Sequence, residues 1–292
     1  MADYKRRLTD RYDGRRIRTL GAFYGIIPFI MRSRMDSQNY FEDKIEISHT
    51  EAYLRRKRKD GFNDINFLHI MIAAMVRTIS QRPALNRFIA GQRIYARKEI
   101  LASLAIKKEL KSNSPETTIK FRFEPNDTID VIAAKINKAI EENKKPENSN
   151  DTDKTARLFM LCPSFLVRFL IWLVRLSDFV GLMPKALNKV SPFHTSFFIT
   201  DLGSLGIQPV YHHLYDFGTT SFFIAFGTKV REKTFDVNNN IVEKKYVNLK
   251  VVTDERIVDG YYYASAFKLY KTLVQHPERL ELPPDKVEED IE

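Results

Sequence analysis

Two short segments dense in phenylalanine and isoleucine, residues 196–200 and 221–227, constrain the fold of this 292-residue chain most strongly. A strand that is apolar on both faces is covered on both sides in the folded protein, so we expect both segments to be central strands of a buried sheet. With 43% hydrophobic and 12% aromatic residues, the chain is able to build a sizeable core. This composition excludes a disordered, collagen-like or coiled-coil protein.

Helical and extended patterns alternate along the remainder of the sequence. Apolar stripes with helical spacing occupy 67–75, 129–140 and 263–274, and strands are expected at 44–48, 100–106, 119–123 and 247–251. Because both kinds of element are mixed along the whole chain, without an internal repeat, a single α/β domain is predicted.

The ends of the first long helix and the longest polar stretch give further expectations. Asn63 or Asp64 is expected to cap the helix, which should end before Pro83, and His69 on its polar side is assigned no role. The polar stretch 141–153 is predicted to be an exposed loop.

The charge is distributed unevenly along the chain. There are 47 Lys and Arg residues against 37 Asp and Glu, a net charge of +10, and the acidic tail 278–292 leaves +15 on the residues before it. Such a surface attracts anionic partners such as CoA, nucleic acid or a membrane. No nucleic-acid partner is expected, because the five-cation run at 55–59 lacks interleaved aromatic residues and a binding motif; it is predicted to be a solvated helix end.

No segment is expected to span a membrane. The most apolar stretch, 158–184, is interrupted by Pro163, Arg168, Arg175 and Asp178, which leave uncharged runs shorter than the roughly 18–20 residues of a span. Two interpretations stay open. The stretch is either a helix on a membrane surface or a helix packed on the domain with one polar stripe, where Asp178 could pair with Arg175.

Several common site signatures are absent. The single cysteine, Cys162, excludes an internal disulfide framework and a cysteine-rich zinc site, and with no secretory signal it predicts a cytoplasmic protein. The turn at 203–206 has neither the glycines nor the lysine of a phosphate-binding loop. His212 and His213 point to opposite faces of an extended segment, so one of them lines a pocket or neither is functional. No metal site is expected.

Two segments remain that could carry chemistry. Thr200 ends the first apolar strand immediately before a glycine turn, where a hydroxyl is well placed to donate a hydrogen bond to a developing oxyanion. In the second segment, the strand 247–253 ends in the charged turn Asp254-Glu255-Arg256, and Gly260 precedes the last helix.

At these two segments the sequence resembles the catalytic domain of the 2-oxoacid dehydrogenase acyltransferases and, more distantly, the chloramphenicol acetyltransferases. The family ends its catalytic strand in Asp-His-Arg-x-x-Asp-Gly, which is similar to residues 254–260, and its hydroxyl motif Thr-Ile-Ser/Thr-Asn-x-Gly is similar to residues 198–203. Weaker similarities lie at 83–86 and 103–106. Because both motifs occur in the family's order and spacing, the resemblance covers about residues 30–277.

The resemblance implies a fold and an assembly. The fold is a two-layer α/β sandwich of the CoA-dependent, chloramphenicol acetyltransferase-like type, with a mixed sheet and packed helices. The chain is then divided into a basic N-terminal segment, 1–29, an acyltransferase-like catalytic domain, 30–277, and an acidic C-terminal tail, 278–292. The implied assembly is a homotrimer, or a larger particle of trimers, whose active site takes its hydroxyl and its base from neighbouring subunits.

The resemblance also implies an acyltransferase in which a histidine deprotonates a CoA or dihydrolipoamide thiol. The thiolate attacks an acyl thioester, and a Ser or Thr hydroxyl stabilises the oxyanion. Thr200 matches the hydroxyl, and Asp259 matches the family's aspartate, which forms an orienting ion pair with an arginine. In this chain the position of the histidine is occupied by Glu255.

The replacement of histidine by Glu255 leaves two functions open. A glutamate has a reference pKa of about 4.3 against about 6.5 for histidine, so it is a weak base at neutral pH unless burial raises its pKa. General-base catalysis contributes about 10²–10⁴-fold. The chain is therefore either an acyltransferase with Glu255 as base, or a catalytically inactive trimeric scaffold or regulatory subunit.

The thiol carrier is expected to be CoA or a lipoyl group on a separate protein. Asp43-Lys44 and Asp153-Lys154 share the dipeptide of lipoyl attachment, but only 42 residues precede Asp43 and no Ala/Pro-rich linker follows. We therefore expect no lipoyl group on this chain. A separate acyl-carrier protein and an active paralogue are the candidate partners.

Overall fold

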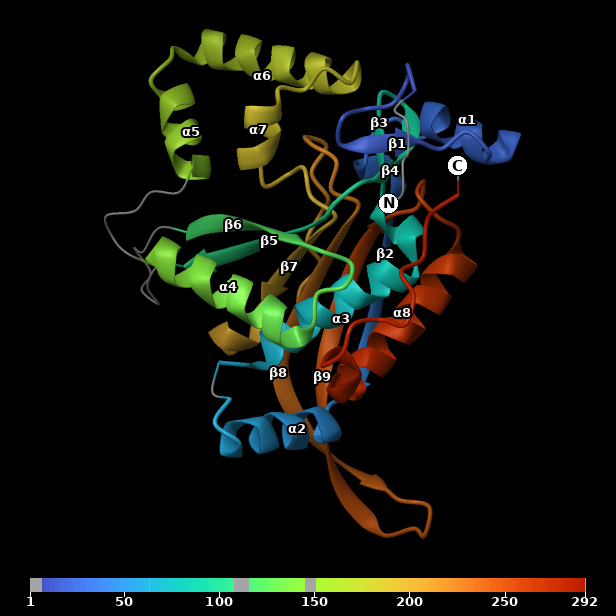
Figure 1. Ribbon diagram of the computed structural model, residues 1–292, viewed down its shortest axis with the longest axis vertical. Helices are drawn as coiled ribbons and strands as arrows, with labels where there is room; N and C mark the ends of the chain where they lie inside the picture. The colour runs from blue at the N-terminus through green and yellow to red at the C-terminus, as the bar shows by residue number, and fades with distance from the viewer. Residues whose placement is uncertain (1–6, 63, 108–115, 145–150, 292) are drawn as a thin grey trace.

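The computed structural model describes residues 7–62, 64–107, 116–144 and 151–291. Its centre is a six-stranded sheet in the order β2-β9-β8-β7-β5-β6 (Figure 1). The strands are β2 (Gln38–Glu46), β5 (Ile100–Lys107), β6 (Glu116–Phe123), β7 (Phe197–Asp201), β8 (Phe222–Phe235) and β9 (Ile241–Asp254). β7 is parallel to β5 and β8, and the other neighbours are antiparallel. The two most apolar segments are central strands, as predicted.

A second, three-stranded sheet lies at the upper end of the molecule in Figure 1. Its order is β1-β4-β3, formed by Gly14–Arg16, Arg93–Arg97 and Arg87–Ala90. Gly91 and Gln92 turn the chain between β3 and β4, and both have positive φ. The sequence patterns did not predict these strands, because they are short and five of their twelve positions are arginines rather than members of an alternating apolar run.

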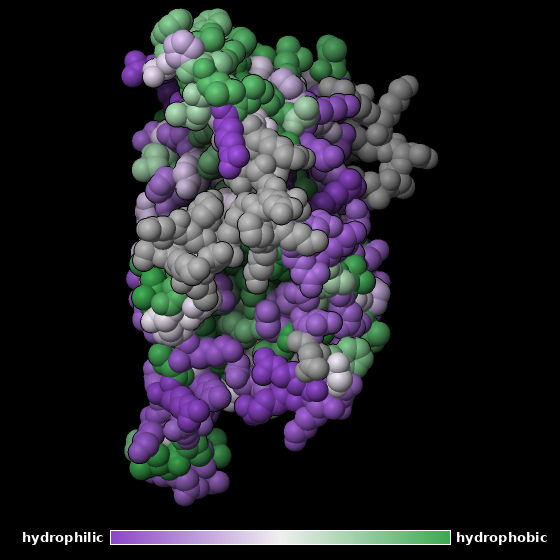
Figure 2. Space-filling model, turned by 90° about the vertical axis from the view of Figure 1, so that its left-hand side faces the viewer, coloured by the Kyte–Doolittle hydropathy of each residue, from purple (hydrophilic) through white to green (hydrophobic). Residues whose placement is uncertain are grey.

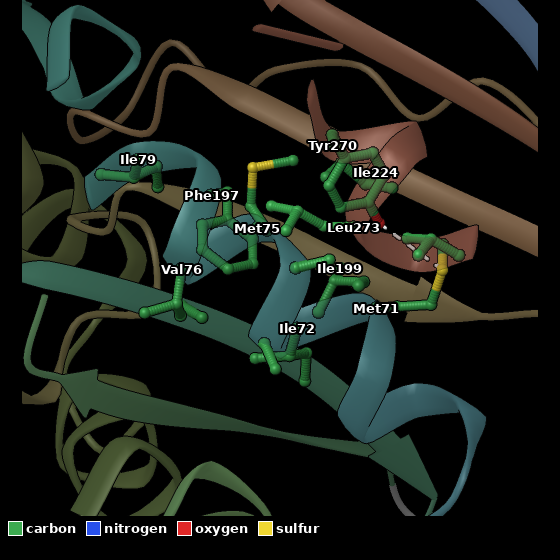
Figure 3. Packing of buried hydrophobic residues seen from close by; sticks show 14 of the residues in the cluster. Met71, Ile72, Met75, Val76, Ile79, Phe197, Ile199, Ile224, Tyr270 and Leu273 are labelled. Carbon is green, nitrogen blue, oxygen red and sulfur yellow. Dashed lines mark hydrogen bonds between the residues drawn. The ribbon is translucent and has the colours of Figure 1, made fainter. Parts of the chain in front are cut away.

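Three long helices cover one face of the large sheet: α3 (Phe67–Gln81), α4 (Ile129–Lys144) and α8 (Gly260–Gln275). Figure 3 shows α3 packed beside α8, with Ile72 and Met75 of α3 near Phe197 and Ile199 of β7. The hydroxyl of Tyr270 on α8 donates to Met71 Sδ at 3.6 Å. The main core is therefore the layer between the helices and the sheet, as the helical stripes predict.

The opposite face of the sheet is covered by chain without regular structure. Phe198, Phe223 and Val252 form a small buried cluster there with Leu214, which belongs to the irregular segment between η3 (Gly203–Leu205) and β8. The ring of His212 stacks on Phe223 with centroids 4.5 Å apart. The structure is thus a two-layer α/β arrangement with a mixed sheet and packed helices, and the predicted fold class is confirmed.

Several element ends differ from the predictions. The strand expected at 44–48 begins earlier, at Gln38, and Ser48 already opens α2 (Ser48–Lys59), whose end is the predicted cationic helix end. The cap of α3 is Asn66, which exchanges hydrogen bonds with His69 in a capping box. His69 is buried, and burial lowers its pKa to about 4.

The polar stretch predicted as a loop is helical at both ends. α4 continues to Lys144, and α5 (Asp151–Met160) starts within the stretch; residues 145–150 lie outside the described part of the chain. Solvent-exposed residues of a helix are polar and charged, as loop residues are. Composition alone therefore did not locate the end of α4 or the start of α5.

The apolar stretch 158–184 contains the end of α5 and the whole of α6 (Ser164–Phe179), and α7 (Lys185–Val190) follows it. None of the residues of α6 is buried, so this helix lies on the domain with an apolar surface toward water. None of the described helices is long and apolar enough to cross a membrane.

A buried charge network ties α6 to the N-terminal segment. Arg11, which is 2% exposed, contacts Asp13 at 2.8 Å and Asp178 of α6 at 2.6 Å. His194 Nε2 lies 3.4 Å from the same Asp178 carboxylate. The expectation that Asp178 pairs with Arg175 is therefore wrong. Although burial opposes ionisation, the contacts with His194 and Arg11 hold the pKa of Asp178 well below its usual range.

The acidic tail packs along the helical layer. Arg77 of α3 donates to the carbonyl oxygens of Arg279 and Leu282, and the Glu288 amide donates to Ser80 O at 2.9 Å. Beyond them, Asp290 forms a two-pronged ion pair with Arg87 of β3 at 2.6 and 2.7 Å, and both side chains are less than one-tenth exposed. The tail thus reaches from α8 to the small sheet.

We expect Asp178→Asn to lower the free energy of unfolding by about 3 kcal/mol at pH 7, because Arg11 loses a buried partner. Since the pKa of Asp178 is depressed in the fold, its stabilisation is present above the reference value near 3.9 and is lost as the pH falls. Urea denaturation at pH 7 and pH 3 should show the difference between wild type and variant narrowing in acid. Glu243→Gln, at an exposed ion pair with Arg231, should change stability by less than about 0.5 kcal/mol.

Candidate active site

The turn after β9 is fixed by a buried ion pair. Arg256 Nε and Nη2 donate to the two carboxylate oxygens of Asp254 at 2.8 and 2.7 Å, and both side chains are essentially inaccessible. Arg256 Nη1 also donates to Met31 O, and the hydroxyl of Tyr263 donates to Asp254 O. The conformation of the turn is therefore set by the residues on either side of Glu255.

Glu255 lies between Asp254 and Arg256 in the sequence, but its side chain takes no part in their ion pair. Its amide donates to Ser37 O at 2.9 Å, and its carboxylate Oε2 accepts a hydrogen bond from Asn39 Nδ2 at 2.9 Å. The residue is half-buried. Within one chain the carboxylate therefore lies at the edge of the sheet where β2 begins, and it is accessible from outside the chain.

Thr200 is half-buried near the end of β7, beside Ala225 of β8. Alternation along β7 places it on the same face as Phe198, which is the face opposite the helical layer. Within the described part of the chain its hydroxyl makes no hydrogen bond, so it is available as a donor to a bound group.

The glycine turn after Thr200 is closely packed. Asp201 Oδ1 accepts from the Ser204 amide at 3.0 Å, and burial raises the pKa of Asp201. A Cβ on Gly203 would lie 2.5 Å from Gly227 O, so a side chain there would push the turn off β8. The residues that follow Thr200 in the motif thus fix the end of β7.

The sheet register separates Thr200 from Glu255 within one chain. Thr200, Ala225 and Lys250 are neighbours across β7, β8 and β9, and Glu255 lies five residues further along. With about 3.3 Å per residue and about 4.8 Å between strands, the two backbone positions are about 19 Å apart. One chain therefore does not bring this hydroxyl and this carboxylate to the same substrate atom.

Asp259 acts locally as the N-cap of α8. Its Oδ1 accepts from the Tyr262 amide at 2.7 Å, and its side chain is exposed. Among the described residues no arginine forms an ion pair with it. The nearby Arg87 donates to Ile257 O and is paired with Asp290 of the tail.

Two other features could hold a ligand. A depression of about 520 Å³ is lined by β2, β9 and the segment before β8. Its lining includes Lys44, Gln208 and Lys250, and Lys250 is in register with Thr200 across the sheet. His49, His276 and Glu278 bring ligand atoms within 4.8 Å of one another. All three lie at the surface where α2 meets the end of α8, away from Thr200 and Glu255.

Sequence reasoning missed the groups that surround Glu255. Asn39, Ser37 and Met31 come from a segment more than 200 residues away in sequence and carry no motif. The pairing of Arg87 with Asp290 likewise has no local signal. The cap role of Asp259 did have one, since an aspartate directly before a helix is a typical N-cap.

Comparison with known proteins confirms the predicted resemblance. Residues 187–282 match the family model of the 2-oxoacid dehydrogenases acyltransferase catalytic domain, a segment that includes Thr200, Glu255 and Asp259. No curated protein matches the sequence.

Solved structures with the same fold cover most of the chain. A probable dihydrolipoamide acetyltransferase from Listeria monocytogenes is 16% identical, with a TM-score of 0.57 over 86% of this chain and 92% of that one. The dihydrolipoamide acetyltransferase of Azotobacter vinelandii is 12% identical, with a TM-score of 0.58 over 84% of each chain. A chloramphenicol acetyltransferase is 12% identical, with a TM-score of 0.52 over 90% and 98%. At these identities the likeness shows the fold.

We expect Asp259→Ala to lower the free energy of unfolding by about 1 kcal/mol, because α8 loses its cap. Asp259→Ser keeps a capping oxygen and should restore most of that loss. Thermal denaturation of the three proteins gives the comparison. If Asp259 acts through an ion pair instead, the serine variant will be as unstable as the alanine variant.

Proposed function

We propose that this protein transfers an acyl group between a thioester and a thiol at sites formed where two copies of the chain meet. One copy supplies the hydroxyl of Thr200, and its neighbour supplies the carboxylate of Glu255. The acyl donor and acceptor are a CoA or lipoyl-type thiol carrier that is not attached to this chain.

The register of the sheet is the observation that carries this proposal. Thr200 and Glu255 lie about 19 Å apart in one chain, yet both lie in the segment that matches the acyltransferase model. A site that uses both groups therefore needs two copies. Thr200 lies on the sheet face without helices, and Glu255 lies at the edge where β2 starts, so each is accessible to a neighbouring copy.

The proposed reaction conserves protons. The Glu255 carboxylate accepts the thiol proton, and the thiolate attacks the carbonyl carbon of the acyl thioester. Thr200 Oγ1 donates a hydrogen bond to the oxyanion of the tetrahedral intermediate. When the intermediate collapses, the C–S bond of the original thioester breaks, and the departing thiolate takes the proton back from Glu255.

A second candidate function is a non-catalytic trimeric scaffold or regulatory subunit, partnered by an active paralogue. The observation that favours it is Glu255 itself, a weaker base than histidine at neutral pH. Its hydrogen bond to Asn39 also gives the carboxylate a structural role at the start of β2. The acyltransferase and the scaffold predict different turnover but the same trimeric assembly.

Turnover of acetyl-CoA with dihydrolipoamide should identify the base. We expect Glu255→Gln to reduce turnover by about 10²–10⁴-fold, because the general base is removed. Glu255→His should keep or increase turnover, since Asp254, Arg256 and Gly260 already match the family. If wild type shows no turnover above background and its melting temperature does not rise with CoA, the scaffold function is correct.

Mixed assemblies should show whether the site is shared. Thr200→Val and Glu255→Gln should each be nearly inactive alone. When the two variants are co-expressed in equal amounts, random trimers contain intact hydroxyl–carboxylate pairs at about one quarter of the sites, so about a quarter of wild-type turnover should return. No recovery in mixed trimers would contradict the shared site.

Light scattering should give the mass of three 34.1 kDa chains, or a multiple of it, at micromolar concentration. A trimer is expected because each site needs two copies and three such contacts close a ring. The same measurement on Glu255→Gln provides the control, since the substitution should leave the mass unchanged. A monomeric wild type would contradict both the catalytic and the scaffold function.

A further inference from the structure

The outward face of α6 is apolar and exposed along its whole length. Its side chains follow helical spacing and are between 43% and 75% exposed: Phe165, Phe169, Trp172, Leu173, Leu176 and Phe179. The inward face carries Asp178, which anchors the helix through Arg11. A stripe of this size toward water is uncommon on a free protein surface and marks an interaction site.

A second helix presents a similar face at the same end of the molecule. α1 (Ala22–Ile30) exposes Phe23, Ile26, Phe29 and Ile30 at between 50% and 72%. Figure 1 shows α1 and α6 at the upper end of the long axis, and Figure 2 shows hydrophobic side chains gathered at that end. We call the exposed faces of α1 and α6 the apolar end.

The charges around the apolar end are almost all positive. Residues 157–190 contain five cations and one acid, which is the paired Asp178. The cations are all exposed: Arg157, Arg168, Arg175, Lys185 and Lys189. Residues 14–35 contain no acid and five arginines, of which Arg18 and Arg32 are exposed. The apolar end is therefore complementary to an anionic surface.

We propose that the apolar end binds the surface of an anionic lipid bilayer, with α6 lying in the interface. Aromatic and leucine side chains on one face, with arginines beside them, are the composition of interfacial helices. At 16 residues α6 is too short to span a bilayer but long enough to lie along it. Arg168 and Arg175 then face the lipid phosphates.

A second copy of this chain is a poorer occupant of the apolar end. In a two-fold contact between two α6 helices, each copy would place its cations against those of the other. The only acid in residues 157–190 is already paired, so the repulsion would have no local compensation. An anionic bilayer supplies both an apolar layer and the opposite charge.

This inference does not rest on the proposed acyl transfer. Neither Thr200 nor Glu255 lies on α1 or α6, and the segment matched by the family model begins after α6, at residue 187. Membrane binding is thus measurable on Glu255→Gln as well as on wild type.

Trp172 makes the test specific, because it is the only tryptophan of the chain. With vesicles of phosphatidylcholine and phosphatidylserine at about 7:3, we expect the full chain to co-float and its tryptophan emission to shift to shorter wavelength. Pure phosphatidylcholine vesicles should bind at least about tenfold more weakly. Arg168→Gln with Arg175→Gln should weaken binding to the anionic vesicles by about tenfold or more.

Two variants separate the apolar end from exposed apolar residues elsewhere. Leu173→Glu should abolish co-flotation, whereas Phe235→Glu, at the exposed hairpin on the opposite end of the molecule, should bind like wild type. If Leu173→Glu and wild type co-float equally, the proposal is wrong. It is also overturned if no vesicle binds and Leu173→Glu instead lowers the mass measured by light scattering, because a second copy then covers this face.

Discussion

The ion pair between Asp254 and Arg256 is the contact on which the candidate site depends. A buried ion pair is stable only when its geometry is good and the remaining donors and acceptors of both residues are hydrogen-bonded. Here Arg256 and Asp254 each have a second partner. Arg256 reaches Met31 at the end of α1, and the backbone of Asp254 receives Tyr263 from α8 and donates to Ser221 before β8. The N-terminal segment, the sheet and the last helix therefore meet at one turn, and Glu255 occupies the position between the two charges.

This arrangement makes the shape of the turn independent of the side chain at position 255. The side chain at position 255 takes no part in the ion pair, and its amide is held by Ser37. A glutamate is accommodated because its carboxylate finds Asn39 at the start of β2. The residues that fix the turn are thus distinct from the side chain that the turn presents to its surroundings.

The sequence was informative where one strong pattern determined the structure. The Phe- and Ile-rich segments could only be central strands, and the stripe through Met71 and Met75 could only be a core-facing helix. The small sheet was missed because its strands are short and rich in arginines, whose burial depends on partners such as Asp290 that are distant in sequence. The exposure of α6 was not predictable, since that helix is apolar on both faces and periodicity does not say which face meets water.

The long hairpin formed by β8 and β9 extends beyond the rest of the sheet. β2 ends at Glu46, opposite Tyr246, and β7 ends at Asp201, opposite Phe226. The pairing from Arg231 to Phe235 therefore has no third strand beside it among the described residues. A two-stranded ribbon is only marginally stable and opens without disturbing the domain behind it. Its tip, between Val237 and Asn238, is therefore a natural insertion point for a fluorescent domain or an affinity handle, at the end of the molecule opposite α1 and α6.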